Sequence, residues 1–208
     1  MHIDDAVTVR GGRAAAPGRP LLLLLHGYGS NEQDLAGLGA SLPGWSWASV
    51  RAPLTLGRGA YAWFPVTTPG SPDPSGVGAG TQALLAWVDA TVEPGRPVVP
   101  IGFSQGGVMA SQLLRAAPER VPTAAILAGF VLPGEQPGDA VLAAARPPVF
   151  YGRGDADRVI AGDAVARTDA WLPGISTPDS HVYPGLGHGI SAAMLEDLAS
   201  FLARSGVA

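Results

Sequence analysis

The chain alternates between short, continuous apolar runs and longer helical patterns, and no other feature of the sequence constrains its fold so strongly. Four apolar runs flanked by Gly or Pro occupy residues 21–25, 98–103, 123–127 and 148–151. Runs of this length are typical of strands that are buried on both faces. Five stretches carry apolar residues at the spacing of an amphipathic helix: 31–42, 80–91, 105–116, 162–172 and 190–202. Alternating strands and helices predict an α/β fold, with a mostly parallel central sheet, helices on both faces and ligands at the carboxyl ends of the strands.

The alternation continues along the chain without an internal repeat, so we expect a single domain over residues 1–208. Residues 65–80, PVTTPGSPDPSGVGAG, lack apolar periodicity. Because the same alternation resumes after them, we interpret this stretch as a surface loop near the expected site and not as a domain linker. Pro100 stands inside the run 98–103, where its missing N–H removes a ladder hydrogen bond, so we expect this strand to be irregular.

Charge and residue usage exclude several classes of function. The net charge is −4 and the basic residues form no stripe, whereas nucleic-acid binding needs clustered cations, so we expect no nucleic-acid partner. All 13 basic residues are arginines, which removes Walker-A phosphate binding, Schiff bases and pyridoxal chemistry. The absence of cysteine excludes disulfides, thiolate catalysis, iron–sulfur clusters and cysteine zinc sites.

Signals for export or membrane insertion are missing from the expected places. The first ten residues carry Asp4 and Asp5 and no apolar stretch, unlike a signal peptide. The most membrane-like run, residues 21–25, is far shorter than the roughly 20 residues that span a bilayer. We therefore expect a soluble, cytoplasmic protein without stable membrane insertion.

A serine stands at the junction between the run 98–103 and the helical pattern that follows it. Gly102, Ser104 and Gly106 form G-x-S-x-G, in which the glycines leave room for a sharp strand-to-helix turn and for a close substrate. In a Gly-rich chain the pentapeptide alone can also be a simple turn. Its place between a strand and a helix favours Ser104 as a nucleophile.

A serine hydroxyl needs a base to attack at neutral pH, and the chain has four histidines. His188 lies in the Gly-rich loop PGLGHGI before the last helical pattern, and in this kind of fold the base comes last along the chain. That order favours His188 over His26, which follows the first apolar run. We interpret His181, in a strand-like HVY run, as structural and His2 as solvated.

The third group of such a site is a carboxylate that orients the imidazole. Asp155 and Asp157 both follow the run 148–151, in VFYGRGDADRVI. Both positions lie where a strand ends, so position alone leaves the choice between them open. The one that is not the triad acid would be a turn-forming, solvent-facing residue.

Backbone N–H groups are the expected ligands of a developing oxyanion. One belongs to Gln105, the residue after the nucleophile, and the second to the loop HGYGSN after the first apolar run, whose H-G-x-G pattern indicates Tyr28. A dinucleotide-binding loop is the competing interpretation. However, Gly27 and Gly29 lack the third glycine of that motif.

Five stretches, taken in order, resemble the carboxylesterase and phospholipase family of α/β-hydrolases, which includes the acyl-protein thioesterases. They are LLLLHGYGSNEQDL, RAP with AYAWF, GFSQGG, GRGDADRVI and GLGHGI, and they extend over about residues 21–202. The resemblance implies an α/β-hydrolase fold with Ser104 as nucleophile, Asp157 within G-x-x-D as acid and His188 as base. It also implies Tyr28 and Gln105 as oxyanion donors.

Three positions depart from the pattern of that family. Arg153 stands where the family often has His, Ile160 where Pro is common, and Pro65 where an acid is common. The triad is not affected by these changes. They bear on the preference for the acyl and leaving groups, because the segment around Pro65 is expected to border the cleft.

The cleft is expected to be open and apolar. About 20 residues separate the runs 123–127 and 148–151, too few for the cap domain that larger α/β-hydrolases insert there. The expected lining comes from these residues: Tyr61, Trp63, Phe64, Phe130, Val131 and Leu132. A core position is the alternative for Trp63, and packing under the sheet is the alternative for residues 130–132.

The sequence thus predicts a serine esterase that acts on esters of short- to medium-chain acyl groups through an acyl-enzyme, with thioesters left open. We expect a small-molecule ester as its partner and neither a cofactor nor a metal, while a homodimer remains open. An acyltransferase with the same triad and a non-catalytic carrier of hydrophobic ligands on the same fold are the alternatives.

Overall fold

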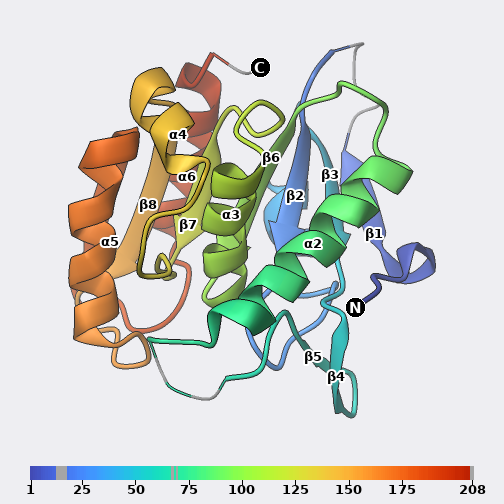
Figure 1. Ribbon diagram of the computed structural model, residues 1–208, viewed down its shortest axis with the longest axis horizontal. Coiled ribbons are helices and arrows are strands. Elements are labelled where there is room, and N and C mark those ends of the chain that lie inside the picture. The colour runs from blue at the N-terminus through green and yellow to red at the C-terminus, as the bar shows by residue number, and fades with distance from the viewer. Residues whose placement is uncertain (13–17, 67, 69, 207–208) are drawn as a thin grey trace.

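A seven-stranded sheet forms the centre of the molecule in a computed structural model that describes residues 1–12, 18–66, 68 and 70–206 (Figure 1). Its strands, in spatial order, are β1 (Val9–Gly12), β3 (Ser46–Val50), β2 (Leu21–Leu25), β6 (Val98–Phe103), β7 (Ala124–Leu127), β8 (Pro148–Gly154) and β9 (Thr177–Tyr183). Neighbouring strands are parallel except at one edge, where β1 runs antiparallel to β3. The predicted mostly parallel sheet is confirmed.

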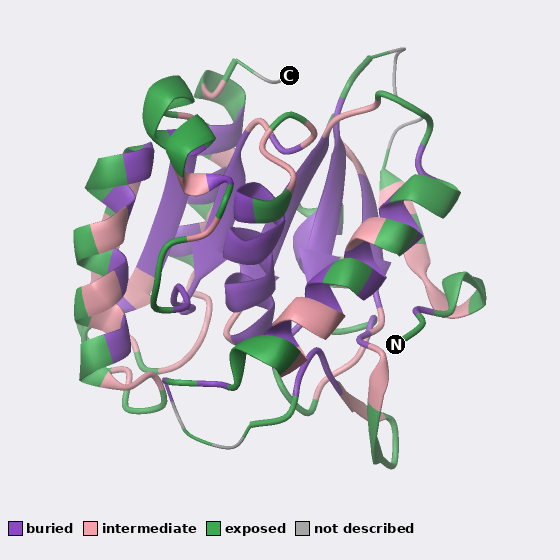
Figure 2. Ribbon diagram, in the orientation of Figure 1, coloured by how far each residue is buried: buried purple, intermediate pink, exposed green. Residues whose placement is uncertain are grey.

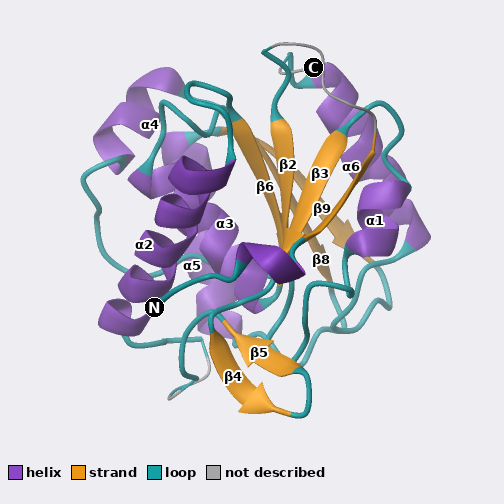
Figure 3. Ribbon diagram, turned by 90° about the vertical axis from the view of Figure 1, so that its right-hand side faces the viewer, coloured by secondary structure: helices purple, strands orange, loops and turns teal. Residues whose placement is uncertain are grey.

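Helices cover both faces of this sheet, as predicted (Figures 1 and 3). One face carries α2 (Pro74–Thr91), α3 (Gln105–Ala116), α4 (Asp139–Ala145) and α5 (Gly162–Ile175). The other carries α1 (Ala36–Ala40) and α6 (Ala192–Arg204). A single turn of 3₁₀ helix, Asp5–Val7, precedes β1.

The apolar run of β2 shows how the two faces share one strand. Leu21, Leu23 and Leu25 pack in the cluster under α2, α3 and α5, whereas Leu22 and Leu24 pack in the cluster under α1 and α6. Successive side chains of a strand point to opposite faces, so a continuous apolar run is what a strand covered on both sides requires. Figure 2 shows the strands buried between helices whose outer sides are exposed.

The helix α2 begins earlier than predicted, so the expected loop 65–80 is wrong over its last residues. Asp73 caps the helix by accepting a hydrogen bond from the N–H of Ser75 at 3.2 Å, and Pro74 occupies the first helical position. Within this helix, Gly80 lies so close to the backbone of Trp63 that a Cβ at Gly80 would be 2.6 Å from the Trp63 carbonyl oxygen. Gly80 therefore permits the close packing of α2 on the segment around Trp63.

Other elements also differ from the prediction. The pattern 31–42 yields only the short α1, and turns take the place of the helix over residues 32–35. The strands β1 and β3 were not predicted, nor was a separate hairpin of β4 (Leu54–Gly57) and β5 (Ala60–Ala62). This hairpin projects beyond the carboxyl ends of the sheet strands (Figure 3).

Pro100 is accommodated in the central strand β6 by its place in the register. The N–H groups of Val98 and Ser104 donate on the β7 side, to the carbonyls of Arg120 and Leu127. Because N–H direction alternates along a strand, Pro100 faces the same side, and pairing with β7 begins only at Ile101. The missing donor therefore falls outside the paired part of the β6–β7 ladder.

The segment between β7 and β8 contains one short helix, α4, as expected for a fold without a cap domain. No helix among the described residues is long and apolar enough to cross a membrane.

Candidate active site

Ser104 lies at the sharp turn between β6 and α3. Its backbone adopts φ 55° and ψ −114°, a left-handed conformation that a non-glycine residue adopts only under strain. A Cβ at Gly102 would clash with the carbonyl of Gly106, and one at Gly106 would clash with the carbonyl of Leu25. The two glycines of the motif are therefore needed for the approach of backbone to backbone that presents Ser104.

His188 and Asp157 lie in line with this serine. The Nε2 atom of His188 is 2.9 Å from the Ser104 Oγ, and its Nδ1 is 2.7 Å from an Asp157 carboxylate oxygen. A neutral imidazole with its proton on Nδ1 donates to Asp157 and accepts from the Ser104 hydroxyl. The structure thus joins three side chains from the ends of β6, β8 and β9 that the sequence predicted together.

The Asp157 carboxylate is held in its charged form. Burial alone would raise the pKa of Asp157, but the hydrogen bond from His188 and those from the N–H groups of Val159 and Ile160 outweigh it and place the pKa below its usual value. The N–H groups lie 2.8 and 3.3 Å from the other carboxylate oxygen. A carboxylate bound in this way has one orientation toward the imidazole.

Asp155, the other candidate acid, has a different set of contacts. Its carboxylate accepts a hydrogen bond from the N–H of Gly185 at 2.6 Å and lies at the exposed surface. This contact joins the loop after β8 to the loop that carries His188. Asp155 therefore aligns the two loops without touching the imidazole.

The remaining histidines lie away from the serine hydroxyl. His26 is fully buried: its Nδ1 donates to the Gly27 carbonyl at 2.8 Å and its Nε2 accepts from the N–H of Ala52 at 3.1 Å. Burial lowers the pKa of His26, so the ring is neutral and structural. His181, on the edge strand β9, contacts Asp179 at 2.7 Å, and His2 is exposed near the N-terminus.

The two expected oxyanion donors border the same space as Ser104. Tyr28 and Gln105 both line the cavity that contains Ser104. In the described part of the chain, neither backbone N–H donates a hydrogen bond to another residue. The first N–H groups of a helix have no intrahelical partner, so the N–H of Gln105 is available to a ligand.

The loop that carries Tyr28 is fastened to the β4–β5 hairpin. Gly29 donates to the Tyr61 carbonyl and Tyr61 to the Ser30 carbonyl, each at 2.9 Å. Just after this loop in the sequence, Glu32 accepts two hydrogen bonds of 2.6 Å from the guanidinium of Arg51, which keep the pKa of Glu32 below its usual value. These contacts give the Tyr28 loop a defined position.

The side chain of Gln105 has a role that sequence reasoning missed. Its amide oxygen accepts from the Trp63 N–H at 2.8 Å, and its amide nitrogen donates to the Phe64 carbonyl at 2.7 Å. The Trp63 indole donates to the His26 carbonyl at 2.8 Å and is fully buried. Gln105 thus fastens the segment that precedes the cleft wall, and its sequence position alone gave no signal of this.

A cavity of about 230 Å³ opens beside Ser104. Phe64 and Phe130 line it, as expected, together with Val66, Gly70 and Ile160. Its lining is mostly apolar, which suits a hydrocarbon chain.

Part of the expected lining is wrong. Trp63 is a core residue under α2, and Leu132 lies buried beyond the cavity wall; neither lines the cavity, and neither do Tyr61 and Val131. The physical reason is burial, because Trp63, Val131 and Leu132 pack into the core beneath the helices instead of facing the cavity. Sequence reasoning also missed Val159 and Thr68, which have no motif to mark them.

Among the described residues, no group of three or more His, Asp or Glu side chains could hold a metal ion.

Comparison with known proteins places this geometry in a family. The profile of the phospholipase/carboxylesterase family matches residues 9–205. A probable carboxylesterase of Oryza sativa subsp. japonica is 30% identical over 91% of this chain and 79% of its own. Acyl-protein thioesterase 1 of Kluyveromyces lactis is 23% identical over 95% of this chain and 96% of its own. The crystal structure of the Bacillus cereus carboxylesterase superposes with a TM-score of 0.82 at 23% identity, covering 97% of this chain and 96% of that one.

Fold and comparisons together define an α/β-hydrolase. The chain belongs to the phospholipase/carboxylesterase family, and the protein is a carboxylic-ester hydrolase. Small-molecule esters are the substrates that this family implies.

Proposed function

We propose that this enzyme hydrolyses carboxylic esters of short- to medium-chain acyl groups, with Ser104 as nucleophile, His188 as base and Asp157 as the acid that orients it. One observation carries the proposal. The three side chains form a continuous hydrogen-bonded line, and its serine end borders an apolar cavity.

In the first step Ser104 Oγ attacks the ester carbonyl carbon while His188 Nε2 takes the hydroxyl proton. The carbonyl oxygen becomes an oxyanion and binds the N–H groups of Tyr28 and Gln105. The tetrahedral intermediate collapses, its bond to the alkoxy oxygen breaks, and the imidazolium gives its proton to the departing alcohol. Asp157 stabilises the imidazolium throughout.

In the second step water replaces the alcohol. His188 takes a proton from the water as the water oxygen attacks the acyl carbon, and then returns that proton to Ser104 Oγ when the bond to the serine breaks. The products are a carboxylic acid and the regenerated enzyme. Ester and water supply every atom of the acid and the alcohol, so the reaction balances.

The acyl group is proposed to enter the cavity between Phe64 and Phe130. Each buried methylene is worth about 0.8 kcal/mol, or about a fourfold gain in kcat/KM, until the chain reaches the end of the cavity. Thioesters of the same acids are a second substrate class, favoured by the name of the Kluyveromyces lactis relative. The described elements include no cap domain over the cleft, so we expect no rise in rate when the substrate passes into micelles.

The test is a series of esters and thioesters from acetyl to octanoyl, measured with the wild type and with Ser104→Ala. We expect kcat/KM to rise with chain length in the wild type, and Ser104→Ala to lose about 10⁴- to 10⁶-fold for every substrate while it stays folded. Unchanged hydrolysis by folded Ser104→Ala would remove Ser104 from the mechanism. A steady fall from acetyl to octanoyl would reject the acyl assignment of the cavity.

The same assay separates the alternatives. A non-catalytic carrier would bind the esters without releasing acid. An acyltransferase would form more ester than acid when an alcohol acceptor competes with water, whereas a hydrolase releases mainly acid.

A further inference from the structure

Two walls of the acyl cavity come from segments that are distant along the chain. Gly70 belongs to the loop after the β4–β5 hairpin, and Phe130 belongs to the segment that follows β7. Neither segment forms a strand or a helix at these positions. Something other than regular secondary structure must therefore set the spacing between the two walls.

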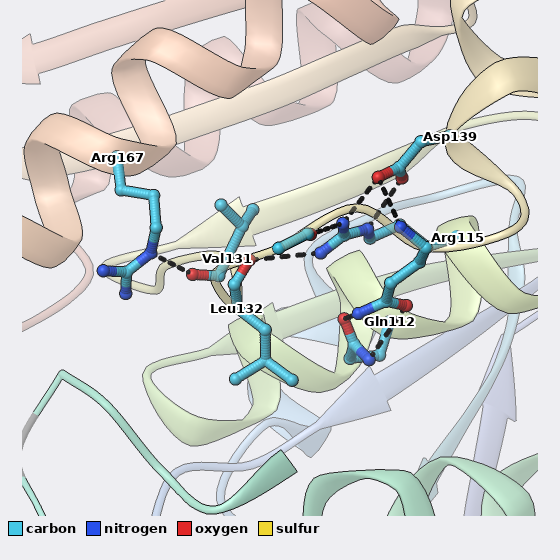
Figure 4. Close-up of polar contacts among 8 residues, drawn as sticks. Gln112, Arg115, Val131, Leu132, Asp139 and Arg167 are labelled. Atoms are coloured by element: carbon cyan, nitrogen blue, oxygen red, sulfur yellow. Dashed lines mark hydrogen bonds and ion pairs between the residues drawn. The ribbon is translucent and has the colours of Figure 1, made fainter.

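One side chain of α5 bridges the two segments. The Nε of Arg167 donates to the Val131 carbonyl at 2.9 Å, and a terminal nitrogen of the same guanidinium donates to the Gly70 carbonyl at 2.7 Å. The guanidinium carbon also lies 5.9 Å from the centre of the Phe130 ring. Figure 4 shows Arg167 reaching from its helix to Val131.

The contacts around this bridge show that both segments are seated on α5. The N–H of Val131 donates to the hydroxyl of Thr168 at 3.0 Å, so neighbouring side chains of one helix bind both the N–H and the carbonyl of Val131. Gly70 has φ +74° and is buried, and a Cβ there would lie 2.8 Å from the Cβ of Ala161 at the start of α5. The Gly70 turn is thus pressed onto the helix that supplies Arg167.

Within the described residues, the ion pairs do not include Arg167. Its charge is directed at carbonyl oxygens, and its planar fork spans two acceptors at once, which a single ammonium does less well. The segment after Val131 has a separate anchor, because Arg115 of α3 donates to the Leu132 carbonyl at 3.2 Å and pairs with Asp139 (Figure 4). Loss of Arg167 would therefore remove the side chain that joins the two walls, while Thr168 and Arg115 keep the segment after β7 attached.

We propose that Arg167 is a positioning residue that sets the acyl-chain specificity of this enzyme, by holding the Gly70 and Phe130 walls of the cavity at one spacing. The proposal rests on the proposed function, since it assigns the cavity to the acyl group. Arg167 is placed to act on chains that reach these walls and not on the bond that breaks at Ser104. Its loss should raise KM for longer chains and leave kcat for acetyl esters in place.

The test compares Arg167→Met with the wild type on acetyl and hexanoyl esters of one alcohol. Methionine keeps an apolar stem and removes every donor. We expect the hexanoyl-to-acetyl ratio of kcat/KM to fall by about tenfold, because the freed walls no longer bury the added methylenes. This fall should come from a higher KM for the hexanoyl ester and not from a lower kcat. The rate of labelling of Ser104 by a small fluorophosphonate should not change.

Arg120→Met is the matched control. Arg120 also holds two backbone carbonyls, those of Arg96 at 3.0 Å and Glu93 at 3.4 Å, but it lies at the opposite ends of the strands. Its ratio should equal that of the wild type even if its melting temperature falls as far as that of Arg167→Met.

A hexanoyl-to-acetyl ratio within about twofold of the wild type in folded Arg167→Met would overturn the inference, as would an equal fall in Arg120→Met. Failure of the proposed function looks different. In that case the wild type itself would not be labelled at Ser104 or would show no preference among chain lengths.

Discussion

The reacting end and the acyl end of the cavity are held in place by different kinds of contact. Around Ser104 backbone packs on backbone, because Gly102 and Gly106 have no room for a side chain. Around the acyl end two loops are held on α5 by the side chain of Arg167. Backbone packing at the central strands thus fixes the position of Ser104, whereas a side chain of a peripheral helix joins the two cavity walls. Variants at the two ends should therefore change different kinetic constants.

The largest effect is expected at the base. His188→Ala should lower kcat/KM by about 10⁴- to 10⁶-fold for acetyl and hexanoyl esters alike, because nucleophile and base act as a unit. His181→Gln is the control, since His181 contacts Asp179 on the edge strand and should leave the kinetics near wild type. Steady-state assays on both purified variants show which of the two histidines is the base. Loss of activity in His181→Gln with retention in His188→Ala would reverse the assignment.

Asp157→Asn should come next, with a loss of about 10⁴-fold, because an amide holds the imidazole in the wrong tautomer and does not stabilise its cation. Asp155→Asn should be mild, since the amide oxygen can still accept the hydrogen bond from Gly185. Comparing kcat of the two variants distinguishes the two carboxylates. A mild Asp157→Asn beside a severe Asp155→Asn would contradict the site described above.

Gly106→Ala tests the backbone contact at the reacting end. The added methyl group would meet the Leu25 carbonyl, so we expect a loss of about 1–3 kcal/mol in the free energy of unfolding and an equal fractional loss of activity on short and long esters. Gly78→Ala, in α2, has open space at its Cβ and should instead gain up to about 1 kcal/mol. Urea unfolding measures both. A Gly106→Ala enzyme that loses activity only on long-chain esters would contradict the proposed difference between the contacts around Ser104 and those around the cavity walls.

The smallest effect concerns pH. Burial lowers the folded-state pKa of His26 below its unfolded value of about 6.5, so the unfolded chain binds more protons and stability rises with pH in that window. The contribution of His26 to the free energy of unfolding is complete above its unfolded-state pKa. It is lost as the pH falls toward the folded-state pKa, and the free energy of unfolding changes by at most about 1.4 kcal/mol per pH unit. His26→Gln should show a shallower slope between pH 7 and 5 in urea unfolding. An identical slope would mean that His26 does not titrate between the two states.

Features that depend on backbone geometry could be predicted from the sequence. The runs 21–25 and 98–103 became β2 and β6 with the predicted bounds, because strands buried on both faces need continuous apolar residues. The G-x-S-x-G motif marks the turn at Ser104, because no other residue than glycine fits at its flanks. The structure brings His188 within hydrogen-bond distance of Ser104, and Asp157 within hydrogen-bond distance of His188. The catalytic roles of these residues remain predictions.

Features that depend on long-range packing could not be predicted. The strand β3 has the sequence SWASV, whose mixed residues carry no strand signal, and it forms because β1 and β2 pair with it on either side. The cavity wall brings Gly70 and Phe130 together, and Arg167 of α5 bonds to the backbone beside both of them, although no local pattern connects these three residues. Trp63 and Phe64 are both predicted to line the cleft, and only the tertiary structure shows that Phe64 borders the cavity whereas Trp63 is buried in the core.

The most direct test of the central claim is to treat the wild type with a small fluorophosphonate and to locate the adduct by peptide mass spectrometry. We predict one adduct, on Ser104, that is absent from Ser104→Ala and forms far more slowly in His188→Ala. An adduct on another residue, or continued ester hydrolysis by an enzyme that takes up none, would contradict the account.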